Sequence, residues 1–167
     1  MSCLGVHFAL TNSEVAKLKS MPGEQDRLEY LTEEIEVKYL DGDKQFAAES
    51  DKSWDAMHRV LSDSQLTWDG GDYPLNHVVL AGELLYTDDD YIMSLKTPSQ
   101  VKDIANVIDH ISVENFKSRY LNINSYDYGF ELTDEDFEYT WEWFQNVRQL
   151  YKRAAANDRY VLFTADQ

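Results

Sequence analysis

The sequence predicts an α+β fold, with one small mixed sheet that holds the terminal and central strands and is packed with about six helices. Three observations predict this class. Short apolar segments of strand character lie at both ends of the chain and near its middle. Segments with apolar residues at helical spacing separate them. No repeat, low-complexity tract or linker interrupts the 167 residues, a length typical of one domain. Residues 1–167 are therefore expected to form a single domain in which the first and last strands pair.

The first half of the chain has clear start and stop signals for helices. Thr11 and Glu14 fit a capping box, in which the threonine oxygen accepts from a helical N–H and the glutamate reaches back. Pro22 and Gly23 end the helix that follows. The expected elements of this half are a strand at residues 3–10, a short helix after Thr11, and helices at residues 24–40 and 51–61.

The second half is expected to end in a long helix and a strand. Thr97 and Gln100 form a second capping box. Acidic residues crowd the start of the last helix and basic residues its end, as the helix dipole favours. The expected elements are a strand at residues 91–95, helices that begin after Thr97, Ser112 and Thr133, and a strand at residues 159–165. Residues 77–85 are apolar, and their periodicity does not separate a strand from a short helix.

The helix expected at residues 51–61 carries the first candidate site. Trp54 lies on its apolar stripe, and Ser50 before it is a good N-cap. At about 100° per residue, Asp51, Asp55 and His58 fall beside that stripe on one face. Two carboxylates and an imidazole are able to bind a metal ion or to carry acid–base chemistry. The alternative is structural: Asp51 caps the helix, Asp55 is solvated, and His58 donates to a backbone carbonyl at the edge of the core.

A polar, glycine-bearing stretch at residues 62–74 carries the second candidate site. Loops of this length are uncommon in compact domains and often have a function. Trp68 and Tyr73 are therefore candidate binding residues, and the adjacent glycines allow a tight turn or a close approach to a ligand. The alternative is that both aromatic side chains pack the loop onto the domain. No phosphate-binding glycine motif is present, and no cofactor is expected.

Charge and composition exclude several classes of protein. The formal net charge is −16, which argues against binding to nucleic-acid phosphates or to an anionic membrane. An acidic surface favours a basic protein as a partner, or serves solubility alone. Cys3 is the single cysteine, so no disulfide forms within the chain. No apolar run is long enough to cross a membrane, and the N-terminal residues do not resemble a secretory signal. These features predict a cytoplasmic protein and leave its oligomeric state open.

Several segments together resemble the YfbM-like family of bacterial proteins. The segment Asp51–Leu61, with its tryptophan, second aspartate and histidine, is similar to the most specific segment of that family. Weaker similarities follow in the same order along the chain: the start at Gly5–Phe8, the segment Leu80–Glu83, the helix from Thr97, and the aromatic final helix with Tyr151–Ala156 before a closing strand. The resemblance implies a compact bacterial α+β domain. It implies no reaction, substrate or catalytic residue.

Two functional hypotheses remain. The molecular function is expected to be that of a binding or interaction protein, because the sequence has an acidic surface, many aromatic residues and no catalytic motif. A basic protein is the expected partner. The alternative is a metal-assisted or acid–base hydrolase that uses the face formed by Asp51, Asp55 and His58. That alternative requires the three side chains to converge in a cleft.

Overall fold

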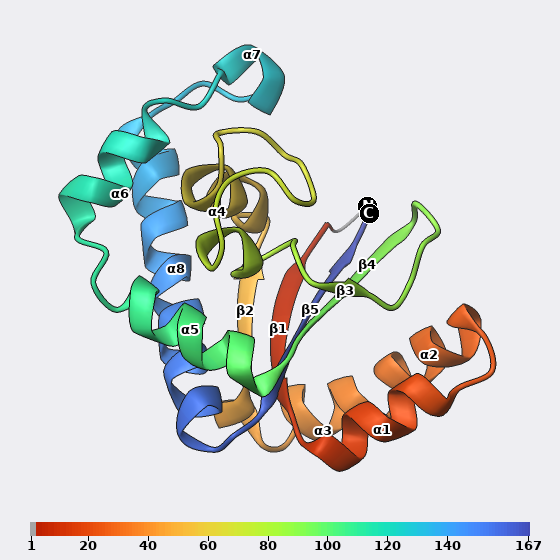
Figure 1. The fold of residues 1–167 in the computed structure, drawn as a ribbon. Coiled ribbons are helices and arrows are strands. Elements are labelled where there is room, and N and C mark those ends of the chain that lie inside the picture. The colour runs from red at the N-terminus through yellow and green to blue at the C-terminus, as the bar shows by residue number, and fades with distance from the viewer. Residues whose placement is uncertain (1–2) are drawn as a thin grey trace.

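A five-stranded sheet with the strand order β2-β1-β5-β4-β3 organises the fold (Figure 1). The computed structural model describes residues 3–167. The strands are β1 (Gly5–Leu10), β2 (Ala47–Asp51), β3 (Glu83–Leu84), β4 (Tyr91–Lys96) and β5 (Tyr160–Asp166). The two terminal strands pair in the middle of the sheet, where Gly5 lies opposite Ala165. The expected pairing of the first and last strands is confirmed.

All strand pairs in the described sheet are antiparallel. The α+β class is confirmed, but the expected mixed sheet is not, because no crossover joins two parallel neighbours. An antiparallel sheet can leave part of one face open, since its connections do not place a helix over each strand pair. That property matters here, because one end of this sheet is open on one face.

The helices divide between the two faces of the sheet (Figure 1). Their bounds are α1 (Asn12–Ser20), α2 (Glu24–Tyr30), α3 (Glu36–Leu40), α4 (Trp54–Leu61), α5 (Pro98–Ile108), α6 (Val113–Tyr120), α7 (Ser125–Tyr128) and α8 (Asp134–Ala156). A π-helical turn at Leu31–Ile35 joins α2 to α3, so residues 24–40 form the continuous helix that the sequence predicts. The two predicted capping boxes are present at the starts of α1 and α5.

Neighbouring residues of β1 point to opposite faces and show which helices cover each one. The ring of His7 lies 5.7 Å from that of Tyr151 in α8, on the face that α4, α5 and α8 cover. The ring of Phe8 lies 6.2 Å from that of Tyr39 in α3, on the face that α1–α3 cover. Both rings of β1 are fully buried. On the face that α1–α3 cover, the end of the sheet near Val6 lines a pocket.

The segment at residues 51–61 differs from the expected helix. Residues Ala47–Asp51 form β2, and the helix begins only at Trp54, with Ser53 rather than Ser50 before it. Asp51 has a left-handed φ of 50°, so the chain turns there and cannot continue into the helix. Ser50 is buried and donates through its hydroxyl to the carbonyl of Gly5, which ties the strand to β1.

Residues 62–85 form a mostly irregular segment. The predicted loop at residues 62–74 has no regular secondary structure. A 3₁₀ turn at Leu75–His77 follows, and only Glu83–Leu84 pair as a strand. The apolar stretch at residues 77–85 is therefore neither a regular strand nor an α-helix over most of its length. None of the helices over residues 3–167 is both long and apolar enough to span a membrane.

Candidate functional site

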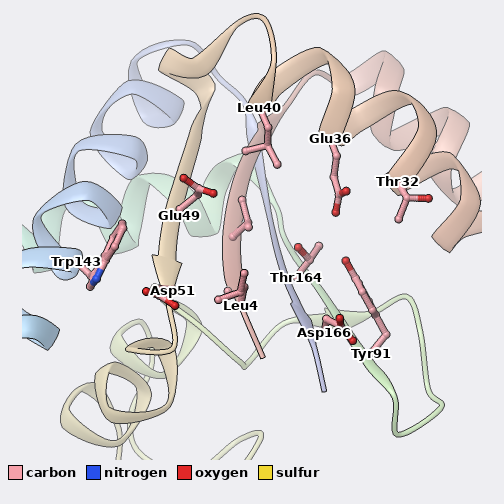
Figure 2. A pocket seen from close by; sticks show the side chains of 12 residues that line it. Leu4, Thr32, Glu36, Leu40, Glu49, Asp51, Tyr91, Trp143, Thr164 and Asp166 are labelled. Atoms are coloured by element: carbon pink, nitrogen blue, oxygen red, sulfur yellow. The ribbon is translucent and has the colours of Figure 1, made fainter. Parts of the chain in front are cut away.

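The open end of the sheet forms a pocket of about 610 Å³ between α3 and α8, here called the open-face pocket (Figure 2). Its floor consists of strands β1, β2, β4 and β5. The helix that contains Glu36 forms one wall, and α8 contributes Trp143 at the opposite side, next to β2. The residues that line it are Leu4, Gly5, Val6, Thr32, Glu36, Leu40, Glu49, Asp51, Tyr91, Trp143, Thr164 and Asp166.

Regular secondary structure places these side chains. Thr32, Glu36 and Leu40 recur at every fourth residue, so they lie on one face of the helix that ends at Leu40. On β2, Glu49 and Asp51 alternate with the buried Ala48 and Ser50, so both carboxylates belong to the open face. The site is thus built on rigid elements and not on the long loop.

Four carboxylates surround the open-face pocket: those of Glu36, Glu49, Asp51 and Asp166. No lysine, arginine or histidine is among the lining residues that the structure describes. Like charges repel one another, and a group of carboxylates gains from a bound cation. The lining therefore favours a positively charged group.

A chain of hydroxyl groups supports Glu36 inside the pocket. The hydroxyl of Thr164 donates to Tyr91, and the hydroxyl of Tyr91 donates to the carboxylate of Glu36. Burial raises the pKa of Glu36, the bond from Tyr91 lowers it, and the charge of Asp166 raises it further, with a net increase. Burial also raises the pKa of Tyr91, so the phenol stays protonated and serves as a donor.

Asp51 is held in an uncommon backbone conformation at the edge of this pocket. Its φ of 50° lies in the left-handed region, which aspartate tolerates better than most residues. The hydroxyl of Tyr139 in α8 donates to its carboxylate and accepts from the backbone N–H of Lys52. The turn after β2 is therefore fixed by α8, and the carboxylate of Asp51 has a defined position.

Apolar side chains complete the open-face pocket. Leu40, Val6 and Trp143 also line the pocket and add aliphatic and aromatic surface to it. Leu4 is 44% exposed at the rim. A charged group with an aliphatic stem matches such a lining, because the stem contacts apolar surface while the head reaches the carboxylates.

The structure distributes the residues of the first predicted site over different places. Asp51 lines the open-face pocket, whereas Trp54 and Asp55 line a second pocket near the start of α8. Trp54 is 5% exposed and donates through its indole N–H to the carbonyl of Cys3. The Asp55 carboxylate accepts from Arg59 at 2.6 Å. The predicted helical face that combines Asp51, Asp55 and His58 does not form, because Asp51 belongs to strand β2.

His58 is fully buried in the core. Its Nε2 donates to the carbonyl of Thr67 at 2.6 Å, and burial lowers its pKa to about 4. Over residues 3–167 no group of three histidine, cysteine, aspartate or glutamate side chains is placed to hold a metal ion, including Asp51, Asp55 and His58. The convergence that the hydrolase alternative requires is absent from the described part of the chain.

Trp68 and Tyr73, the candidate residues of the predicted loop, line neither the open-face pocket nor the pocket that contains Trp54. Trp68 is 44% exposed and borders a small hollow with Asn76 and His77. Tyr73 is 49% exposed, and its hydroxyl donates to Asp103 of α5 at 2.6 Å. Its ring contacts His77 edge-on at 4.9 Å. Tyr73 thus attaches the loop to the domain, as the structural alternative states.

Sequence reasoning did not find most residues of the open-face pocket. The spacing of Thr32, Glu36 and Leu40 could have indicated a second functional face of the helix. These residues lie on its polar side, where a threonine and a leucine interrupt the charged residues. The alternation of Glu49 and Asp51 with small residues was a second usable signal. No local signal could have shown that these segments meet Tyr91 and Asp166, since their contact depends on the strand order.

Comparisons with known proteins give a family and a fold. The family described as "Domain of unknown function (DUF1877)" matches residues 1–164. A crystal structure titled as that of a protein of unknown function, YfbM from Escherichia coli, is similar with a TM-score of 0.64 and 15% sequence identity. The similarity covers 97% of this chain and 99% of that chain. At this identity it supports the shared fold alone, not identity with YfbM. No functionally curated protein matches this chain.

Proposed function

The chain belongs to the DUF1877 family, whose function is unknown, and from its own geometry we propose that it is a binding protein whose open-face pocket receives a basic side chain of a protein partner. The observation that carries this proposal is the group of four carboxylates around a pocket with an apolar lining. Among the described residues, no lysine, arginine or histidine side chain lines this pocket.

The hydrogen-bonding capacity of the pocket favours a guanidinium or ammonium group. Glu49 and Asp51 extend from one strand, and Glu36 faces them across β1 (Figure 2). Within residues 3–167 the carboxylate of Glu49, unlike its backbone in the β1–β2 ladder, has no hydrogen-bond partner. Its oxygens are free to accept N–H donors, and a charge-assisted bond is about twice as strong as a neutral one. Arginine suits the site best, because its planar group pairs with carboxylates and also stacks on aromatic rings such as that of Trp143.

A protein partner is favoured over a free small cation by the shape and charge of the surface. The open-face pocket adjoins two further hollows. One shares Leu40, Glu49 and Trp143 with it and is also lined by Lys44 and Arg153, and the other shares Thr32 and Tyr91. The formal net charge of −16 attracts a basic surface from a distance and speeds association. The pocket would then hold one side chain of a larger interface.

The direct test uses N-acetyl-arginine amide and its neutral isostere N-acetyl-citrulline amide as probes in a two-dimensional amide NMR titration. The arginine probe is expected to shift the amide signals of Val6 and Thr164 in a saturable manner, whereas the citrulline probe is not. Equal binding of both probes, or no binding of either, would overturn the proposal.

Matched variants locate the binding site. Glu49→Gln is expected to weaken binding of the arginine probe about fivefold to tenfold, the usual effect of losing one charge-assisted hydrogen bond. Glu33→Gln is the control, because Glu33 is exposed on the helix that contains Glu36 and does not line the pocket. A Glu49→Gln variant that binds as tightly as the Glu33→Gln control would contradict the proposed location.

A further inference from the structure

The second pocket, lined by Trp54 and here called the aromatic pocket, differs in chemistry from the open-face pocket. It has a volume of about 530 Å³ and lies between the N-terminal segment, the start of α4 and the start of α8. Its lining consists of Cys3, Lys52, Trp54, Asp55, Tyr128, Phe130, Asp136 and Tyr139. Four of these residues are aromatic and two are carboxylates. We propose that this pocket binds an organic cation with a fully alkylated ammonium group.

Aromatic side chains provide the first part of the argument. The electron-rich faces of tryptophan, tyrosine and phenylalanine attract cations, and a group of such rings is the usual way to bind an alkylated ammonium. Phe130 is 66% exposed, and its ring contacts that of Tyr128 edge-on at 5.2 Å. Because this ring lines the pocket and is exposed, a ligand in the pocket is able to contact it. Trp54 is buried at the other side and is held by its bond to Cys3.

The carboxylates of the aromatic pocket supply negative charge but have limited capacity for new hydrogen bonds. Asp136 accepts through one oxygen from the hydroxyls of Tyr120 and Tyr128, at 2.7 and 3.0 Å. Asp55 accepts from Arg59, which is buried. Burial raises the pKa of Asp55, although Arg59 lowers it in part. Both carboxylates already accept hydrogen bonds within the protein. A cation that needs no hydrogen-bond acceptors therefore suits them better than a guanidinium group does.

The charge of the lining agrees with a cationic ligand. Asp55 is already paired with Arg59, so Asp136, which forms no ion pair within residues 3–167, supplies the negative charge, and Lys52 is exposed at the rim. A lysine at the rim repels a cationic ligand without closing the pocket. Removing its charge should therefore strengthen binding. This expectation separates a charge-selective site from a general apolar hollow.

The test compares choline with two relatives that each lack one feature. In 3,3-dimethylbutan-1-ol the shape is kept and the charge is lost, and in ethanolamine the charge is kept and the methyl groups are lost. Calorimetric titration of the full chain is expected to give saturable binding for choline and at least about fivefold weaker binding for both relatives. If the neutral relative binds as tightly as choline, or if no probe binds, the proposal is wrong.

Variants tie this binding to the aromatic pocket. Phe130→Ala is expected to weaken choline binding about fivefold to tenfold. Tyr126→Ala is the matched control, because Tyr126 is a 95% exposed aromatic residue in neighbouring α7 that does not line the pocket. Lys52→Gln is expected to strengthen binding. Equal affinities of the Phe130→Ala and Tyr126→Ala variants would overturn the assignment.

A chemical readout gives an independent check. Cys3 is the single cysteine of the chain and lines this pocket, so its alkylation by iodoacetamide reports on one position. Choline is expected to slow that alkylation, and 3,3-dimethylbutan-1-ol is not. Unchanged alkylation at saturating choline would place the ligand elsewhere. Because Glu49 does not line the aromatic pocket, Glu49→Gln should leave choline binding intact, which keeps this test separate from that of the proposed function.

Discussion

The Nζ of Lys96 donates a hydrogen bond to the carbonyl oxygen of Val79 inside the core. Lys96 is fully buried at the end of β4, and its Nζ also lies within hydrogen-bond distance of the backbone oxygen and the hydroxyl of Ser94, at 3.3 and 3.2 Å. Burial lowers the pKa of Lys96 well below its ordinary value. The described structure pairs this lysine with no carboxylate, so its role is to bind backbone oxygens.

Lys96 is one of several buried side chains that donate hydrogen bonds to backbone carbonyls of the irregular segment at residues 62–85. His7 and Tyr151 both donate to the carbonyl of Val78, at 2.7 Å each. The hydroxyl of Ser94 donates to the carbonyl of Leu80 at 2.7 Å. Buried carbonyls outside regular secondary structure need such partners, because an unsatisfied one costs about 1–3 kcal/mol. These bonds explain how an irregular segment lies buried on the sheet.

Replacing Lys96 with methionine should change how stability depends on pH. The folded state keeps Lys96 with a lowered pKa and the unfolded state does not, so wild-type stability rises with pH below about 10.5. The Lys96→Met variant lacks this contribution to the pH dependence of stability. We expect it to lose about 1–3 kcal/mol from the free Val79 carbonyl and to recover relative to wild type as the pH is lowered. Urea unfolding across the neutral range measures both effects, and Lys52→Met is the exposed control. Parallel pH curves for wild type and Lys96→Met would contradict the expectation.

Two buried histidines predict a loss of stability in acid. Burial and the nearby Lys96 lower the pKa of His7 to about 3, and burial lowers that of His58 to about 4. Unfolding returns both to about 6.5, so below that pH the unfolded state binds more protons and stability falls until the folded-state pKa is reached. His58→Gln keeps a donor for Thr67 and should reduce the slope by up to about 1.4 kcal/mol per pH unit. The substitution His110→Gln, at an exposed histidine, is the control.

The fold could be predicted where local signals decide it. The capping boxes at Thr11 and Thr97 fix helix starts through bonds within four residues, and both were readable. Strand β2 was not readable, because three of its five residues are polar and small or acidic residues favour strands weakly. Its strand conformation comes from pairing with β1, about forty residues away in sequence, and nonlocal pairing leaves little local signal.

The candidate sites were predicted only in part for a related reason. Assigning Asp51 to a helix put it beside His58, whereas the strand puts it beside Glu49 on the open face. Trp54 and Asp55 were found, but their neighbours Phe130 and Asp136 lie about eighty residues later. A constellation of distant residues becomes visible only after the strand order and the position of α8 are known.

Arg59 is expected to be a strong determinant of stability. Its side chain is 5% exposed and contacts two carboxylates at 2.6 Å, those of Asp55 and Asp127. Arg59→Met leaves Asp55 mostly buried without its partner, so we expect a loss of about 2–4 kcal/mol. Asp127 is 60% exposed, and Asp127→Asn should cost less than about 1 kcal/mol, since solvent screens that pair. Chemical denaturation measures the free energy of unfolding of both variants. Equal losses would show that the contact between Arg59 and Asp55 stabilises the fold no more than the exposed contact with Asp127.

The left-handed backbone of Asp51 predicts an unusual order of substitutions. Both Asp51→Ala and Asp51→Gly remove the carboxylate that accepts from Tyr139, so they differ only in the Cβ atom. At a φ of 50° the Cβ is strained, and the glycine variant should be more stable by about 1 kcal/mol. In an ordinary strand position the order is reversed, because glycine is flexible when unfolded. Thermal unfolding of the Asp51→Ala and Asp51→Gly variants measures which of the two is more stable. A more stable alanine variant would mean that the backbone at residue 51 leaves the left-handed region.

Protonation of Glu36 should control binding in the open-face pocket. Burial and the charge of Asp166 raise the pKa of Glu36, so this carboxylate loses its charge at a higher pH than an exposed glutamate does. Binding of the N-acetyl-arginine amide probe should therefore weaken as the pH falls toward that raised pKa, and the bound cation should lower the pKa in return. Glu36→Gln is expected to bind more weakly at neutral pH and to lose this part of the pH dependence, whereas Glu33→Gln should behave as wild type. NMR titrations at several pH values measure both effects. A Glu36→Gln variant with wild-type affinity and an unchanged pH profile would show that Glu36 does not contact the ligand, and binding would then depend on the carboxylates of β2.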